Sequence, residues 1–196
     1  RLPKKVNHMK NIFLFAACLL GAISASAQVT ISPTFATQND SITVTFDASQ
    51  GNGALSGVVP VYAHTGVITT ASASATDWKN VQGNWGQHDP QVLMTAMGNN
   101  LHQISYRISD FYQLGPNDTV LQLAFVFRNG SGSVVGRDPN GDDIYVPIYS
   151  NGFSATIASP TNNLMLSQAD STLFKVETSD TAQIELFVDG TALGAP

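Results

Sequence analysis

The chain has 196 residues, of which 14 are acidic and 9 basic, giving a formal net charge of −5. A negative surface repels phosphate backbones and anionic lipid headgroups, so the composition argues against nucleic-acid and membrane-surface partners and suits a neutral ligand. The only cysteine is Cys18, so no internal disulfide can form and the fold must depend on its core.

The beginning of the chain has the features of an export signal. Residues 1–8 precede the first methionine, Met9, and are expected to be upstream translation. Residues 9–27 combine Lys10, an apolar run too short to span a bilayer, and an A-S-A pattern that ends at Ala27. These features predict a signal peptide cleaved after Ala27, a secreted or cell-surface protein, and no membrane insertion after cleavage.

Lipid attachment at Cys18 is the alternative for this segment. Phe15 is a poor residue at its place in a lipoprotein signal, and the apolar run continues beyond the cysteine, so cleavage is favoured. All 14 acidic residues but only five of the 9 basic ones follow Gln28, so the mature chain is expected to carry a net charge of −9.

Residues 28–150 are predicted to form one all-β domain, an antiparallel immunoglobulin-like β-sandwich. No segment is a convincing helix, and short runs rich in Val, Ile, Phe and Tyr alternate with Gly, Asn, Asp and Pro turns, which is typical of such a sandwich. Hairpins are expected at "MGNNLH" and "RNGSGSVV". The expected strands are Val29–Ser32, Ser41–Phe46, Val58–His64, Val92–Met97, Leu101–Ile108, Val120–Arg128, Val134–Gly136 and Ile144–Tyr149.

Two strands carry further information. In "VLQLAFVFR" the period of two places Leu121, Leu123, Phe125 and Phe127 on a buried face, with Gln122 and Arg128 on the other face. Pro147 in "DIYVPIY" predicts an edge strand or a bulge, because proline cannot donate to a strand ladder.

Residues 151–196 are predicted to be the incomplete start of a second immunoglobulin-like β domain. The segment "AQIELFVDGTALGAP" reads as a strand, an Asp-Gly hairpin turn and the opening of a return strand. The unit has 46 residues, too few to cover both sheets of a sandwich, so the sequence is expected to be a fragment of a longer protein.

The fragment offers no catalytic set. It has no Gly-x-Ser-x-Gly elbow, its three mature histidines (His64, His88 and His102) have no metal-ligand spacing, and its only glutamates are Glu177 and Glu185 in the second unit. Glycoside hydrolysis needs paired carboxylates in a cleft. We therefore assign no catalytic residue and no cofactor.

The segment "GRDPNGDDIY" raises the question of structural calcium. Asp138, Asn140 and Asp142 offer oxygen ligands around Gly141, but the closing glutamate of a calcium loop is missing. Turn formation before the next strand explains the same residues, so they are weak metal candidates.

The stretch "TDWKNVQGNWGQHDP" holds both tryptophans, Trp78 and Trp85, among polar residues without apolar period. Indole planes beside amides can form a shallow platform on which a sugar ring stacks. We select as carbohydrate-binding candidates Trp78, Trp85, Asn84 and Gln82, with Tyr62 and His64 on the preceding strand. The alternative is that a tryptophan seals the gap between the two sheets, as in immunoglobulin domains.

Six segments in order, "VYAHTGVIT", "DWKNVQGNWG", "MTAMGNNLHQISYRI", "FYQLGP", "LAFVFRNGSGS" and "GRDPNGDDIYVPIY", resemble the N-terminal β-sandwich of secreted α-amylase-family glycoside hydrolases of Gram-negative type IX-secreting bacteria. The resemblance covers about residues 58–149. It implies a starch-binding-like module, an α-glucan (starch-like polysaccharide) as partner, and a downstream catalytic barrel in the same chain. None of that barrel is present, so no catalytic residue transfers. A structural immunoglobulin-like spacer of a surface or adhesion protein, without ligand, is the competing hypothesis.

Overall fold

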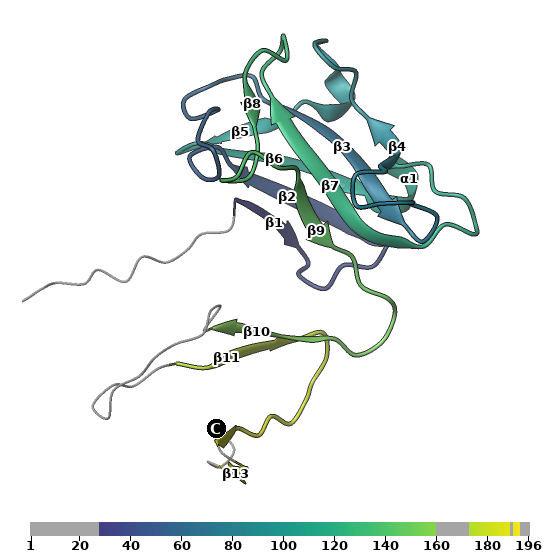
Figure 1. Cartoon of the computed structure of the whole chain (residues 1–196), viewed down its shortest axis with the longest axis vertical. Coiled ribbons are helices and arrows are strands. Elements are labelled where there is room, and N and C mark those ends of the chain that lie inside the picture. The colour runs from purple at the N-terminus through teal and green to yellow at the C-terminus, as the bar shows by residue number, and fades with distance from the viewer. Residues whose placement is uncertain (1–27, 160–172, 189, 193–196) are drawn as a thin grey trace, which may run out of the picture.

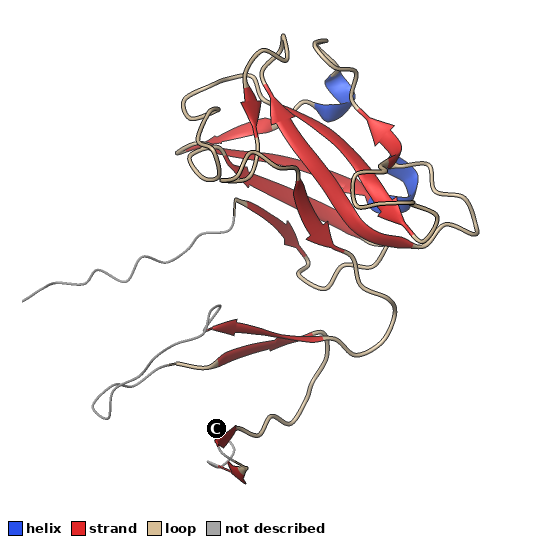
Figure 2. Cartoon of the chain, in the orientation of Figure 1, coloured by secondary structure: helices blue, strands red, loops and turns tan. Residues whose placement is uncertain are grey.

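The computed structural model of the protein describes residues 28–159, 173–188 and 190–192. The expected upstream residues 1–8 and signal peptide 9–27 lie outside this range. The described chain is all-β, as predicted, and its sheets are antiparallel. Figure 2 shows strands throughout the main body and helix only as short turns.

Two stacked sheets form the main body (Figure 1). The first sheet has the order β1 (Val29–Ser32), β2 (Ser41–Asp47), β6 (Leu101–Arg107), β5 (Thr95–Gly98). The second has the order β4 (Lys79–Gln82), β3 (Tyr62–Thr69), β7 (Val120–Arg128), and the far side of β7 pairs with both β8 (Val135–Gly136) and β9 (Ile144–Pro147). This is the ABED and CFG arrangement of an immunoglobulin constant-type sandwich, with β4 as an added strand beside C.

Alternating apolar residues of both sheets build the core between them. Phe46 of β2 and Phe127 of β7 stack across the gap with ring centroids 3.9 Å apart, and Phe125 stacks beside Phe127 at 5.6 Å. All three side chains are fully buried. Burial of side chains this large supplies most of the driving force for folding, on the order of 2–3 kcal/mol each.

A buried tyrosine closes one end of the sandwich. The single turn α1 (Ile108–Phe111) follows β6 and directs Tyr112 inward. Its hydroxyl lies 2.7 Å from Thr65 Oγ1 and 3.1 Å from the Tyr106 hydroxyl. Burial raises the pKa of Tyr112 to about 12, so the phenol remains protonated and ties β3, β6 and the α1 turn together.

Several sequence predictions are confirmed. The strands Val29–Ser32 and Val120–Arg128 have the predicted bounds, and both hairpins pair as expected. Pro147 pairs only with Gln122 of β7, so it lies on an edge strand.

Other bounds were wrong for local reasons. The strand expected at Val58–His64 begins at Tyr62 and runs to Thr69, because Pro60 cannot donate to a ladder. The segment expected at Val92–Met97 starts instead with the 3₁₀ turn η1 (Pro90–Val92), whose first amide is capped by the Asp89 side chain. Its strand, β5, begins only at Thr95.

Other strand ends shift by one or two residues. Ile108 opens α1 and does not continue β6, β8 starts at Val135, and β9 ends at Pro147. Leu121, predicted on the buried face of β7, is 45% exposed near the start of the strand.

The second unit forms small hairpins outside the main body (Figure 1). β10 (Ala155–Ser159) pairs with β11 (Lys175–Thr178), and β12 (Phe187–Val188) pairs with β13 (Thr191–Ala192) across the predicted turn. Among the residues that the structure describes, no helix has the length and apolar character needed to cross a bilayer.

Candidate functional site: an aromatic surface on the outer sheet face

The register of the second sheet determines which residues face away from the core. Thr65 and Phe125 are paired and point inward, so their neighbours His64, Gly66, Ala124 and Val126 point outward. This outer face is not solvated: Ala124 is 0% and Val126 3% exposed. The loops on either side of β4 lie over it and carry the two tryptophans, Trp78 near Gly66 and Trp85 near His64.

Trp78 lies on the sheet over a position without a side chain. A Cβ at Gly66 would stand 3.2 Å from the Trp78 Cβ and 3.3 Å from its ring atom Cε3. The small residues Gly66 and Ala124, which are neighbours across the strands, therefore make room for the indole. Its N–H points to the hydroxyl of Tyr145 on β9 at 3.5 Å, and the ring is partly buried.

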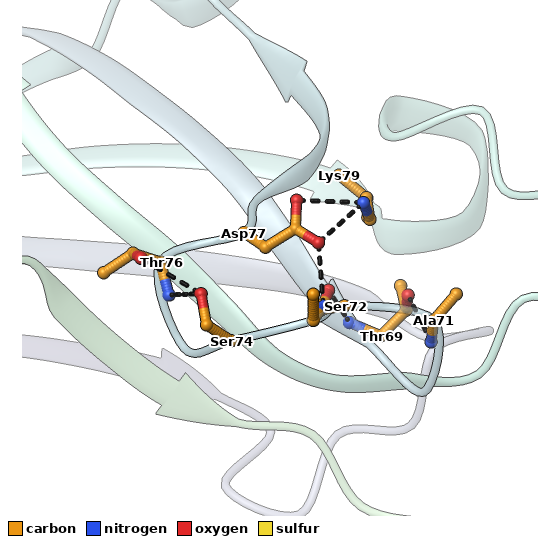
Figure 3. A network of polar contacts seen from close by, with 8 residues as sticks. Thr69, Ala71, Ser72, Ser74, Thr76, Asp77 and Lys79 are labelled. Carbon is orange, nitrogen blue, oxygen red and sulfur yellow. Dashed lines mark hydrogen bonds and ion pairs between the residues drawn. The ribbon is translucent and has the colours of Figure 1, made fainter.

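The loop before Trp78 is held by its own polar contacts (Figure 3). The carboxylate of Asp77 accepts a 2.8 Å hydrogen bond from the Ala73 amide and lies 2.8 Å from the ammonium of Lys79. The hydrogen bond from the Ala73 amide has the larger effect, and together with the bond from Lys79 it lowers the pKa of Asp77 below its ordinary value. Thr69 and Ser72 bond each other through the Thr69 amide and the Ser72 hydroxyl at 3.1 Å, so the start of β4 is fixed.

His64 lies between the two tryptophans. Its ring centroid is 6.0 Å from Trp78 and 5.2 Å from Trp85, with Trp85 edge-on at 90°. His64 Nδ1 lies 2.8 Å from the carbonyl oxygen of Gly83, and because a carbonyl only accepts, Nδ1 carries the proton. Trp85 is 47% exposed. We call Trp78, His64 and Trp85 the aromatic surface.

Arg128 holds the loop that carries Trp85. The residue is 0% exposed, and its guanidinium donates to the carbonyls of Asn84 at 2.7 Å and Gln87 at 2.8 Å. It also donates to the carbonyls of Asn129 at 3.0 Å and Gly130 at 3.2 Å. Burial lowers the pKa of Arg128, but an arginine keeps its proton in proteins. A single cation thus joins the Trp85 loop to the β7–β8 hairpin, which we call the arginine clamp.

Arg128 lies on the face of β7 opposite Phe125 and Phe127, as predicted, and it is buried on that face. The guanidinium lies 4.9 Å from the centroid of the Tyr62 ring. Tyr62 is 4% exposed, and its hydroxyl lies 2.8 Å from His88 Nδ1. Tyr62 therefore packs against the Arg128 guanidinium and has no ring face open to a ligand, contrary to its selection as a binding candidate.

The two amide candidates differ in their position. Gln82 pairs opposite Thr65, which points into the core, so the Gln82 side chain lies on the inner face of the sheet at the β4 edge. It accepts a 2.9 Å hydrogen bond from the Gln91 side-chain amide there. Gln82 is therefore not part of the aromatic surface. Asn84 precedes Trp85 and is exposed. Its backbone amide donates to the Asp89 carboxylate at 3.2 Å and its side-chain amide donates to the same oxygen at 3.3 Å, so it stays at the rim.

The weak calcium candidates form a turn. One carboxylate oxygen of Asp138 accepts from the amides of Asn140 at 2.8 Å and Asp142 at 2.7 Å. Within the described ranges, no three His, Cys, Asp or Glu side chains are grouped so as to hold a metal ion. Turn formation accounts for these residues.

Of the six residues selected from the sequence, the structure brings together Trp78, Trp85 and His64, with Asn84 at the rim. The alternative position for a tryptophan, between the sheets, is occupied by neither ring. Sequence reasoning missed the roles of Arg128, His88 and Tyr145. The glycines of "RNGSGS" were the available signal: a Cβ at Gly130 would stand 2.6 Å from the His88 ring, and one at Gly132 would stand 2.7 Å from Trp85 Nε1.

The fold and this cluster define an immunoglobulin-like β-sandwich domain with a loop-borne aromatic surface on one outer face. Residues 29–135, more than half of the chain, match the family described as "Domain of unknown function (DUF8578)", and the protein belongs to this family. No curated protein matches the chain.

Proposed function

We propose that the sandwich is a non-catalytic glucan-binding module of a secreted α-amylase-like glycoside hydrolase, and that it holds a starch-like polysaccharide on the aromatic surface. The observation that carries the proposal is the exposure of Trp85, 47%, in a loop fixed by the arginine clamp. An apolar plane that remains in water although its loop is ordered is a typical contact for a sugar ring.

The surroundings of Trp85 support a neutral polar ligand. His64 stands edge-on beside the indole, and Asn84 presents an amide next to it. The net negative charge of the chain disfavours anionic partners. Amide and imidazole groups at the margin of an indole suit hydroxyl groups, which both donate and accept hydrogen bonds.

The expected affinity is weak. One stacked ring contributes on the order of 1 kcal/mol, and two rings with a few hydrogen bonds reach about millimolar affinity. In a longer chain with a catalytic domain, such a module is useful because tethering raises the effective concentration of polymer at the enzyme.

Electrophoresis of the chain from Gln28 to Pro196 in gels containing soluble starch tests the proposal. The protein is expected to be retarded, and Trp85→Ala to restore its free mobility. Met97→Ala is the matched control, since Met97 is 55% exposed on the first sheet and its loss should leave retardation unchanged. Equal mobility of the unmutated protein with and without starch refutes glucan binding.

A structural spacer remains the second candidate, favoured by a specific observation. Trp78, Tyr62 and Arg128 all serve to cover the outer face of the sheet, a purely structural task. If starch does not retard the protein and Trp85→Ala leaves its free energy of unfolding within about 0.5 kcal/mol, the spacer is the better description.

A further inference from the structure

A pocket of about 480 Å³ lies beside the aromatic surface, with Tyr145 in its lining. Ala75 and Thr76, from the loop drawn in Figure 3, form one wall. The turn that begins with Arg137 and Asp138 forms the other wall. Its size is within the range of small-ligand sites.

The pocket continues the aromatic surface on the same sheet face. Tyr145 pairs with Ala124, and Ala124 pairs with Gly66, the residue beneath Trp78. The Tyr145 hydroxyl accepts from the Trp78 indole N–H at 3.5 Å, so its own proton is available to a ligand. Tyr145 on β9 is two strands away from His64 on β3, about 10 Å, a distance that one extended oligosaccharide can bridge.

Both walls are held in place before any ligand arrives. On one side the Ser74 hydroxyl bonds the Thr76 hydroxyl at 3.1 Å. On the other side Asp138 caps its own turn, and Arg137 is paired with Asp143. Preorganised polar groups lose little conformational entropy on binding, which favours even a weak ligand.

The polar groups of the pocket suit hydroxyls better than ions. Arg137 is neutralised by Asp143, and the Asp142 carboxylate has no hydrogen-bond donor among the side chains and amides that the structure describes, so it can accept from a ligand. The acidic excess disfavours anions. A metal ion needs several carboxylates aimed at one point, and across the described residues no such group exists.

We propose that this pocket is a second sugar subsite, which takes a neutral pyranose ring of the same glucan chain that stacks on Trp85. The inference rests on the proposed function. Tyr145 donates a hydrogen bond to a ring hydroxyl, and Asp142 accepts one. The ligand is therefore a chain of several sugars, and a disaccharide reaches only the Trp85 end.

NMR titration of the two indole N–H signals with maltose and with maltoheptaose tests this subsite in the chain from Gln28 to Pro196. Tyr145→Phe and Asp142→Ala are each expected to weaken maltoheptaose binding roughly two- to tenfold, the effect of one hydrogen bond, and to leave maltose unchanged. Trp85→Ala should abolish both. Asp110→Ala, which removes an exposed carboxylate in α1 outside the pocket, should change neither.

The outcomes separate the two proposals. If the unmutated protein binds neither sugar, the proposed function is wrong and the subsite falls with it. If it binds maltoheptaose and Tyr145→Phe and Asp142→Ala bind equally well, only the subsite is wrong. Equal weakening of maltose also refutes a second subsite. An effect of Tyr145→Phe without one of Asp142→Ala refutes it too, because the lost contact to Trp78 would then be the cause.

Discussion

Replacement of Arg128 by methionine should release the loop that carries Trp85. Methionine keeps most of the aliphatic volume over Tyr62 but donates no hydrogen bond, so all four carbonyls lose the guanidinium as a donor. The carbonyls of Asn84, Gln87 and Asn129 each keep a backbone amide donor, and among the described residues only the Gly130 carbonyl is left without one. A hydrogen bond from a charged group contributes about 1.5–3 kcal/mol, and a buried unsatisfied group costs a similar amount. The contributions of the four hydrogen bonds cannot be added, because the carbonyls of Asn84 and Gln87 can accept hydrogen bonds from water once the loop moves away from the hairpin.

We therefore expect Arg128→Met to lower the free energy of unfolding by about 2–4 kcal/mol. The loss should appear in urea denaturation followed by circular dichroism. Acrylamide quenching of tryptophan fluorescence under native conditions should rise, because Trp85 and its loop leave the hairpin. Arg128→Lys should fall between the two proteins, since an ammonium is a point donor and does not span two loops as a planar fork does.

Arg107→Met is the control for the loss of an arginine as such. Arg107 is 52% exposed in its side chain, lies 3.8 Å from Asp110, and donates to the carbonyl of Asn39 at 3.0 Å. An exposed pair of this kind contributes about 0–1 kcal/mol. If Arg128→Met costs no more than Arg107→Met and leaves quenching unchanged, the reasoning about the clamp is wrong.

Three further predictions concern other parts of the sandwich. Burial lowers the pKa of His102 below its ordinary value of 6.5. The contribution of the neutral imidazole to stability is therefore fully present above pH 6.5 and is lost as the pH falls through the lower folded-state pKa. His102→Leu should remove this pH dependence of the urea midpoint between about pH 7.5 and 5. Gly66→Ala, whose Cβ would meet the Trp78 indole, should cost about 1–3 kcal/mol in urea denaturation, while Gly115→Ala, with its nearest contact at 3.4 Å, should cost little. Asp77→Ala should reduce the hydrogen-exchange protection of the Ala73 amide. In the unmutated protein the same protection should be lost as the pH falls below 3.8, because the pKa of Asp77 in the folded state lies below that ordinary value.

Strands with a strict period of two were predictable from sequence. In β7 the apolar residues Leu123, Phe125 and Phe127 alternate and all face the core, and the Asn-Asn hairpin after Gly98 fits its turn because both asparagines have positive φ, 50° and 63°. Such local signals do not depend on the rest of the fold.

The outer face was less predictable because its cover comes from elsewhere in the chain. Alternation shows that Arg128 points away from the core, but not that the loop with Asn84, 44 positions earlier, returns to bind it. In the same way, β4 carries no apolar period and was missed, since it is an edge strand of four residues held by pairing with β3 and by the Asp77 network. Long-range contacts of this kind leave only weak traces, here the glycines that admit Trp85 and His88.

The two tryptophans therefore have different roles, although the sequence presents them alike. Trp78 fills the space over Gly66, where the sheet has no side chain, and covers the outer face there, so packing accounts for its burial. Trp85 covers less, and yet its loop is fixed by a buried cation, an arrangement more costly than an apolar contact of the same size. Rigid presentation of one exposed indole is the particular result of that arrangement, and it is the reason why we propose that a ligand binds at Trp85.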